Sequence, residues 1–140
     1  MNEALSAHVL LVEDDRTHRE FICGILESIG CQVTIAYDGK DALSFVARQS
    51  FDLILMDVEM PHMNGLDSAR RIREMMRHGD VQQTPIIAIT ARHEEAMEKA
   101  CRDVGMVDFI PKDIWRPKWE PMIIKTLTRW LPAGITERRA

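Results

Sequence analysis

The sequence predicts an α/β protein in which five strand–helix units form a doubly wound parallel sheet of strand order 2-1-3-4-5. Three short and almost continuous apolar runs support this prediction: residues 8–12, 51–56 and 85–90. Such runs are typical of strands that are covered on both faces. Two shorter or mixed runs, 31–36 and 107–110, are typical of exposed edge strands. Segments with helical spacing follow each of the five runs, as the alternating architecture requires.

Each of the five helices is predicted from apolar residues that recur every three or four positions. Turn and cap signals flank the helices: Gly30 and Gly105 at ends, Asp38-Gly39 and Asn64-Gly65 at starts, and Pro121 in a first turn. The apolar stripes expected to face the sheet are Phe21, Ile25 and Ile29; Leu43, Val46 and Ala47; Leu66, Ala69, Ile72 and Met76; Met97, Cys101 and Val104; and Ile123, Leu127 and Trp130.

Length and composition indicate one globular domain. A chain of 140 residues has the common size of a single domain, and 46% hydrophobic with 29% charged residues excludes disordered and fibrous classes. We expect a folded unit over residues 8–131 between tails at 1–7 and 132–140. No apolar run approaches the roughly 18 residues that cross a bilayer, and the N-terminus does not resemble a signal peptide. These features predict a cytoplasmic protein without a membrane partner.

The charge balance argues against nucleic acid as a partner. The chain has 22 acidic and 18 basic residues, a net charge of -4, and an overall negative field repels phosphates. A run of arginines at 70, 71, 73 and 77 is interpreted as the solvated face of a helix. The three cysteines form no CxxC pair, which favours reduced thiols.

Polar side chains follow the central strands at the points where these strands end. Glu13 and Asp14 come after the first strand, Asp57 after the third, Thr90 closes the fourth, and Lys112 follows the fifth. Because ligands bind beyond the carboxyl ends of the strands in an open parallel sheet, we expect these side chains to meet at one edge. We call these five residues the strand-end cluster.

The chemistry of the strand-end cluster is constrained by its carboxylates. Two carboxylates about 4 Å apart repel by about 4 kcal/mol at an effective dielectric constant of 20, so either one takes up a proton or the group binds a cation. Oxygen ligands, with no His or Cys at ligand spacing, favour Mg²⁺ or Mn²⁺ over zinc. A carboxylate beside such an ion, an ammonium and a hydroxyl is suited to phosphoryl transfer, with the carboxylate as nucleophile.

Four fragments of the sequence, VLLVEDD, DLILMDVEMPHMNGLD, IIAITA and FIPK, resemble the receiver domain of response regulators in two-component phosphorelays, chemotaxis regulators included. The resemblance covers about residues 8–131. It implies a flavodoxin-like fold and a signalling domain, not an enzyme. It further implies that Asp57 accepts a phosphoryl group from a histidine kinase or a histidine phosphotransfer protein. The second fragment is most similar to the receivers of hybrid histidine kinases.

The resemblance also implies a metal site. Glu13, Asp14, Asp57 and the backbone carbonyl of Glu59 would hold Mg²⁺ or Mn²⁺. Asp14 would be the more direct ligand of the acidic pair, and Glu13 would act through water.

Further roles carried over by resemblance concern the phosphoryl group itself. Thr90 and Lys112 would contact it, and Thr90 with Phe109 would form a switch. This switch would change the face made by the fourth helix, fifth strand and fifth helix, to which a downstream protein binds. Glu59 and Arg92, each two positions beyond a site residue, would tune dephosphorylation. From their opposite charges we predict that they pair across the site.

The sequence departs from the family after the fifth strand. The family lysine normally precedes proline, whereas Asp113 follows Lys112 here and Pro111 precedes it. We predict that Lys112 still reaches the site. The following stretch carries Trp115 and Trp119, which we interpret as core residues, with a partner-docking patch as the alternative.

Two other functions stay open at this point. A docking module that works without phosphate is supported only by the unusual Lys112-Asp113 region. A phosphohydrolase of the haloacid-dehalogenase type would need a second Asp two residues after the nucleophile, but Glu59 stands at that position. Such an enzyme would also need a substrate-capping insertion, which this sequence lacks. A monomer or weak dimer is expected, either a stand-alone regulator or the receiver of a hybrid kinase.

Overall fold

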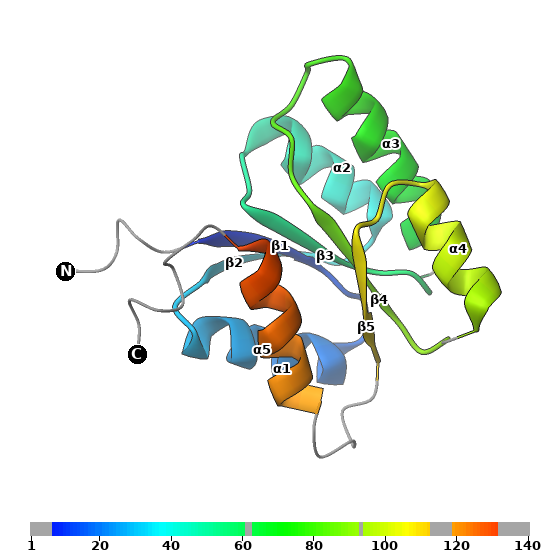
Figure 1. Cartoon of the computed structure of the whole chain (residues 1–140). Coiled ribbons are helices and arrows are strands. Elements are labelled where there is room, and N and C mark those ends of the chain that lie inside the picture. Colours follow the sequence, from blue (N-terminus) through cyan, green and yellow to red (C-terminus); the bar gives the residue numbers. More distant parts are fainter. Residues whose placement is uncertain (1–6, 61–62, 93, 113–118, 132–140) are drawn as a thin grey trace.

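A computed structural model describes residues 7–60, 63–92, 94–112 and 119–131. Its five strands form one sheet of order β2-β1-β3-β4-β5, in which all neighbouring strands are parallel (Figure 1). The strands are β1 (His8–Val12), β2 (Gln32–Ala36), β3 (Leu53–Asp57), β4 (Ile86–Thr90) and β5 (Asp108–Pro111). The helices are α1 (Arg16–Ser28), α2 (Gly39–Arg48), α3 (Gly65–Arg77), α4 (Glu95–Asp103) and α5 (Trp119–Trp130). The predicted fold class and strand order are confirmed.

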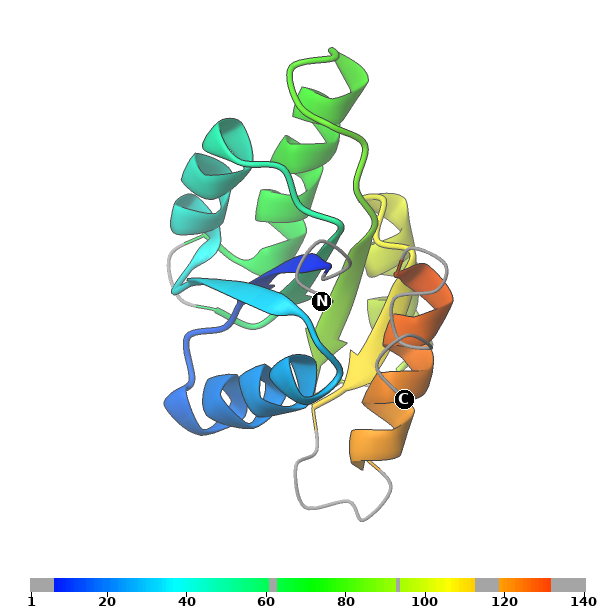
Figure 2. The same ribbon diagram turned by 90° about the vertical axis from the view of Figure 1, so that its left-hand side faces the viewer.

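Helices cover both faces of the sheet. Helices α1 and α5 lie on one face, and α2, α3 and α4 lie on the other (Figures 1 and 2). Alternate residues of each central strand belong to opposite cores: in β3, Leu53 and Leu55 pack with α1 and α5, whereas Ile54 and Met56 pack with the other three helices. A strand buried on both faces needs apolar residues at every position, which explains the continuous apolar runs. Within the described parts of the chain, no helix is both long and apolar enough to cross a membrane.

Short polar residues begin three of the helices. The side chains of Asp15, Asp38 and Asn64 each accept a hydrogen bond from the backbone N–H three residues later. A cap of this kind stabilises a helix by about 1 kcal/mol. After α1 and α4 the chain turns at Gly30 and Gly105, whose φ angles of 94° and 91° are accessible mainly to glycine. The predicted start and end signals are therefore confirmed.

Two predicted core positions are wrong. Phe21 is 39% exposed, and Ile22 occupies the buried stripe of α1 in its place. Ala47 is exposed, and Ala42 is the buried alanine of α2. The apolar stripe of a helix is wide enough that either residue of each pair could face the sheet. Only the packing of the helix on the sheet decides which of the two is buried. The Phe21 ring instead lies 5.2 Å from the ring of Trp119.

Trp119 anchors the start of α5 in the core. Its side chain is fully buried, and its indole N–H donates a hydrogen bond to the backbone carbonyl of Pro111. This contact fastens α5 to the end of β5, directly before Lys112. The interpretation of this tryptophan as a core residue is confirmed, whereas Trp115 and Asp113 lie outside the described residues.

The topology places a switch point between the ends of β1 and β3. The chain passes from β1 to β2 on one side and then to β3 on the other side of β1. The connections after β1 and β3 therefore leave in opposite directions, and ligands of doubly wound folds bind at such a switch point. Glu13 and Asp14 follow β1 directly, and Asp57 ends β3.

Gly65 allows α3 to begin directly against the backbone of Asp57. A Cβ atom at this position would overlap the Asp57 carbonyl oxygen and lie 2.8 Å from the Cα of Val58. We expect Gly65→Ala to lower the free energy of unfolding by about 2–3 kcal/mol in urea titrations, since backbone atoms cannot give way as a flexible side chain can. The control is Gly24→Ala within α1, where a Cβ meets nothing within 4 Å; it should stabilise by about 1 kcal/mol. Equal stabilities of the two variants would contradict this reading.

Candidate functional site

Asp57 lies at the centre of the site and is fully buried. Its Oδ2 accepts a hydrogen bond from the Nζ of Lys112 at 2.7 Å, and its Oδ1 accepts one from the backbone N–H of Glu59 at 3.1 Å. The carboxylate comes from the end of β3 and the ammonium from the residue after β5, which are far apart in sequence. The prediction that Lys112 reaches the site is confirmed.

Glu13 is the second buried carboxylate of the site. Its Oε2 accepts from Lys112 Nζ at 3.2 Å and from the backbone N–H of Asp15 at 3.1 Å. Its other oxygen, Oε1, is buried without a hydrogen-bond partner. An unpaired buried oxygen of this kind costs about 1–3 kcal/mol, so its position favours a further ligand.

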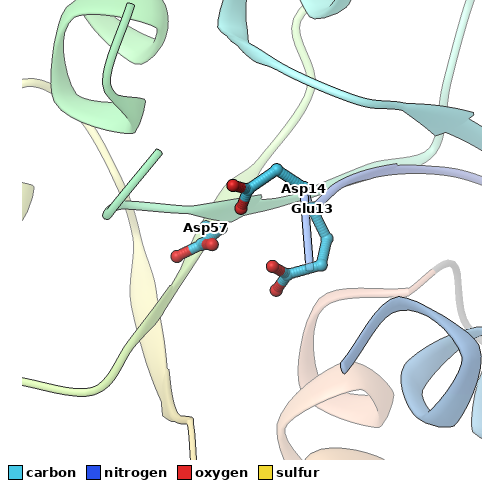
Figure 3. Close-up of side chains that lie close together, drawn as sticks. All are labelled: Glu13, Asp14 and Asp57. Carbon is cyan, nitrogen blue, oxygen red and sulfur yellow. The ribbon is translucent and has the colours of Figure 1, made fainter. Parts of the chain in front are cut away.

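The acidic residues converge on one point at the edge of the sheet (Figure 3). One carboxylate oxygen from each of Glu13, Asp14 and Asp57 lies within 4.8 Å of the others. Asp14 is exposed, whereas the other two are buried. These three carboxylates, one of which carries the unpaired Glu13 oxygen, make a donor set of hard oxygens, which fits Mg²⁺. A single ammonium beside two buried carboxylates leaves an excess of negative charge, which a dication neutralises.

The burial of the site changes the protonation of its groups. Burial raises the pKa of the Asp57 carboxyl to about 8, and the neighbouring Glu13 contributes in the same direction against the opposing Lys112. For Lys112, burial alone lowers the pKa, but the hydrogen bond and charge of Asp57, with those of Glu13, raise it overall. Without a metal ion, Asp57 therefore holds a proton more readily than an ordinary aspartate.

Thr90 ends β4, and its side chain contacts Glu59 and the loop after β4. Its hydroxyl donates to Oε2 of Glu59 at 2.7 Å, and the backbone N–H of Ala91 donates to Oε1 of the same carboxylate at 3.2 Å. The guanidinium of Arg92 pairs with Glu94, with Nε 2.7 Å from Oε1. The predicted pair between Glu59 and Arg92 is therefore wrong. The Glu59 carboxylate is bonded to Thr90 and Ala91, and the Arg92 guanidinium is paired with Glu94.

Phe109 lies in β5 and packs partly buried against the core beneath α4. The guanidinium carbon of Arg102, from α4, stands 4.8 Å above the centre of its ring. Sequence reasoning missed Arg102, because nothing in the spacing of the two residues signals a cation–π contact between elements. It also missed Ala91, whose contribution is a backbone N–H.

Comparison with known proteins identifies relatives of the whole folded region. A family model described as the response regulator receiver domain matches residues 9–123. The chain is 38% identical over 104 residues to the transcriptional regulatory protein CpxR of Escherichia coli K12, covering 74% of this chain and 42% of CpxR. It is 34% identical over 124 residues to hybrid signal transduction histidine kinase L of Dictyostelium discoideum, covering 86% of this chain and 7% of the kinase. The chain thus spans less than half the length of these relatives.

Solved structures show the same arrangement of strands and helices. The chemotaxis protein CheY4 of Vibrio cholerae has a TM-score of 0.78 at 28% identity, covering 90% of this chain and 99% of CheY4. The receiver of sensor histidine kinase PA1611 from Pseudomonas aeruginosa, solved with a magnesium ion in its active site cleft, has a TM-score of 0.75 at 31% identity, covering 89% and 97%. The receiver of histidine kinase CKI1 from Arabidopsis thaliana, complexed with Mg²⁺ and BeF₃⁻, has a TM-score of 0.73 at 28% identity, covering 91% and 94%.

Proposed function

Because the chain belongs to the response-regulator receiver family of two-component signalling, we propose that Asp57 accepts a phosphoryl group from a phosphohistidine. The donor is a histidine kinase or a histidine phosphotransfer protein. The observation that carries this proposal is the buried Asp57 carboxylate, held 2.7 Å from Lys112 beside Glu13 and Asp14. A carboxylate with a cation and further acids around it is equipped to attack phosphorus and to keep the product.

In the proposed step, an oxygen of Asp57 forms a bond to phosphorus while the N–P bond of phosphohistidine breaks. The imidazole nitrogen keeps the electron pair of that bond and takes up a proton. Lys112 neutralises charge on the transferred group, and Thr90 supplies a hydroxyl donor. Mg²⁺, when held by Glu13, Asp14, Asp57 and the Glu59 carbonyl, supplies positive charge for the phosphoryl oxygens.

The output of the proposed switch is the face formed by α4, β5 and α5. Thr90 moves toward the phosphoryl group, and Phe109 at the centre of this face changes position with it. Asp108 of β5 ties this strand to α5, because it accepts hydrogen bonds from Arg129 and Trp130, both at 2.9 Å. A change in β5 is thereby passed to α5, and a downstream protein that binds this face is the expected partner.

The test is transfer from a small phosphodonor. Incubation with acetyl phosphate and Mg²⁺ should add one phosphoryl group, located on Asp57 by peptide mass spectrometry, and chelation with EDTA should prevent the addition. A protein that gains no mass under these conditions would contradict the proposal and favour a docking module that works without phosphate. Release of many equivalents of phosphate from simple phosphate esters would instead indicate a phosphohydrolase.

A further inference from the structure

The side chain of Glu59 holds two hydrogen-bond donors at the edge of the site. Its carboxylate accepts from the Thr90 hydroxyl at 2.7 Å and from the Ala91 N–H at 3.2 Å. Its own backbone N–H donates to Oδ1 of Asp57 at 3.1 Å. Glu59 thus contacts Asp57 through its backbone and reaches across to the end of β4 through its side chain.

The two donors come from the end of β4, the strand that pairs with β3, on which Asp57 lies. Asp57 pairs with Ile89 across β3 and β4, so Thr90 and Ala91 follow at the same edge of the sheet. The hydroxyl and the N–H each have one proton to donate. While the Glu59 carboxylate accepts both, a second anion can engage them only by displacing it.

We propose that the Glu59 carboxylate is an internal anion that occupies the phosphoryl-binding donors of the unphosphorylated protein. This inference rests on the proposed function. A phosphoryl group on Asp57 repels the carboxylate and takes over the Thr90 hydroxyl and the Ala91 N–H. The Glu59 carboxylate therefore opposes the binding of a phosphoryl group at Asp57. When the phosphoryl group displaces this carboxylate from Thr90 and Ala91, the loop after β4 moves with it. Glu59 acts as a positioning residue for Thr90.

The test is the affinity for beryllium fluoride with Mg²⁺, measured by isothermal titration calorimetry. This anion has the shape of a phosphoryl group and needs no donor protein. Glu59→Gln removes the competing charge and should bind about fivefold more tightly than wild type, and Glu59→Ala at least as tightly. The matched control is Glu94→Gln, which makes the same change of charge at a carboxylate paired with Arg92. Its affinity should equal that of wild type.

Two further measurements separate competition for donors from a general structural effect. In a Thr90→Val background, one contested donor is gone, so Glu59→Gln should gain less than the fivefold seen with Thr90 present. In the metal-free protein, Glu59→Gln should move the amide proton resonance of Ala91 upfield, because its N–H no longer donates to a charged acceptor.

An unchanged or weaker affinity of Glu59→Gln, or an equal gain in Glu94→Gln, overturns this inference. If the inference about Glu59 is overturned but wild type binds beryllium fluoride in the same experiment, the proposed function still stands. If wild type binds none, the inference fails, and labelling by acetyl phosphate decides on the proposed function separately.

Discussion

Asp57→Asn abolishes phosphoryl uptake while leaving the fold intact: this is the first expected result. The amide has nearly the same size as the carboxylate but lacks the anionic oxygen that attacks phosphorus. Intact-mass spectrometry after incubation with acetyl phosphate and Mg²⁺ measures the effect, and the labelled fraction should fall from a clear peak to background.

The control for this experiment is Asp103→Asn. Asp103 is an exposed carboxylate at the end of α4 that pairs with Lys99 at 3.0 Å, remote from the strand-end cluster in the fold. It should leave labelling unchanged. Equal labelling of Asp57→Asn and wild type would show that the phosphoryl group goes elsewhere, and the role assigned to Asp57 would be wrong.

The second large effect is a loss of stability of the metal-free protein as pH rises. Burial raises the pKa of Asp57 to about 8 in the folded protein, from an ordinary value of 3.8. The folded state therefore binds the Asp57 proton more tightly than the unfolded state, so the contribution of this group to stability is fully present below about pH 4 and is lost as pH rises to about 8. We expect this loss in the free energy of unfolding to be about 2–4 kcal/mol.

Urea unfolding at several pH values in EDTA measures this loss. The decisive quantity is the difference in stability between wild type and Asp57→Asn at each pH, because this difference isolates the contribution of Asp57. That variant keeps a neutral side chain at all pH values and should be the more stable protein at pH 8. Mg²⁺ should restore stability to wild type at pH 8 and much less to the variant. Parallel pH profiles of the two proteins would contradict the assigned pKa shift.

Much of the site was predictable because strand ends can be read from the chain. Residues 85–89 are apolar throughout, and the first polar residue after them, Thr90, must lie at the sheet edge. Asp57, Thr90 and Lys112 were found in this way. The side-chain partners were not predictable to the same extent: charge alone suggested Glu59 with Arg92, whereas the loop after β4 brings Arg92 to Glu94.

The five strand–helix units, the strand order and the residues that meet at the carboxyl edge could all be predicted from the amino-acid sequence. These follow from local periodicity, turn residues and the connection rules of parallel sheets. The tertiary structure was needed to show that Glu13 has one unpaired buried oxygen, that Glu59 holds Thr90, and that Phe21 lies outward. Such contacts join residues from separate elements, and their distances depend on how helices pack on the sheet and how loops cross its edge. Periodicity along a chain carries no information about these distances.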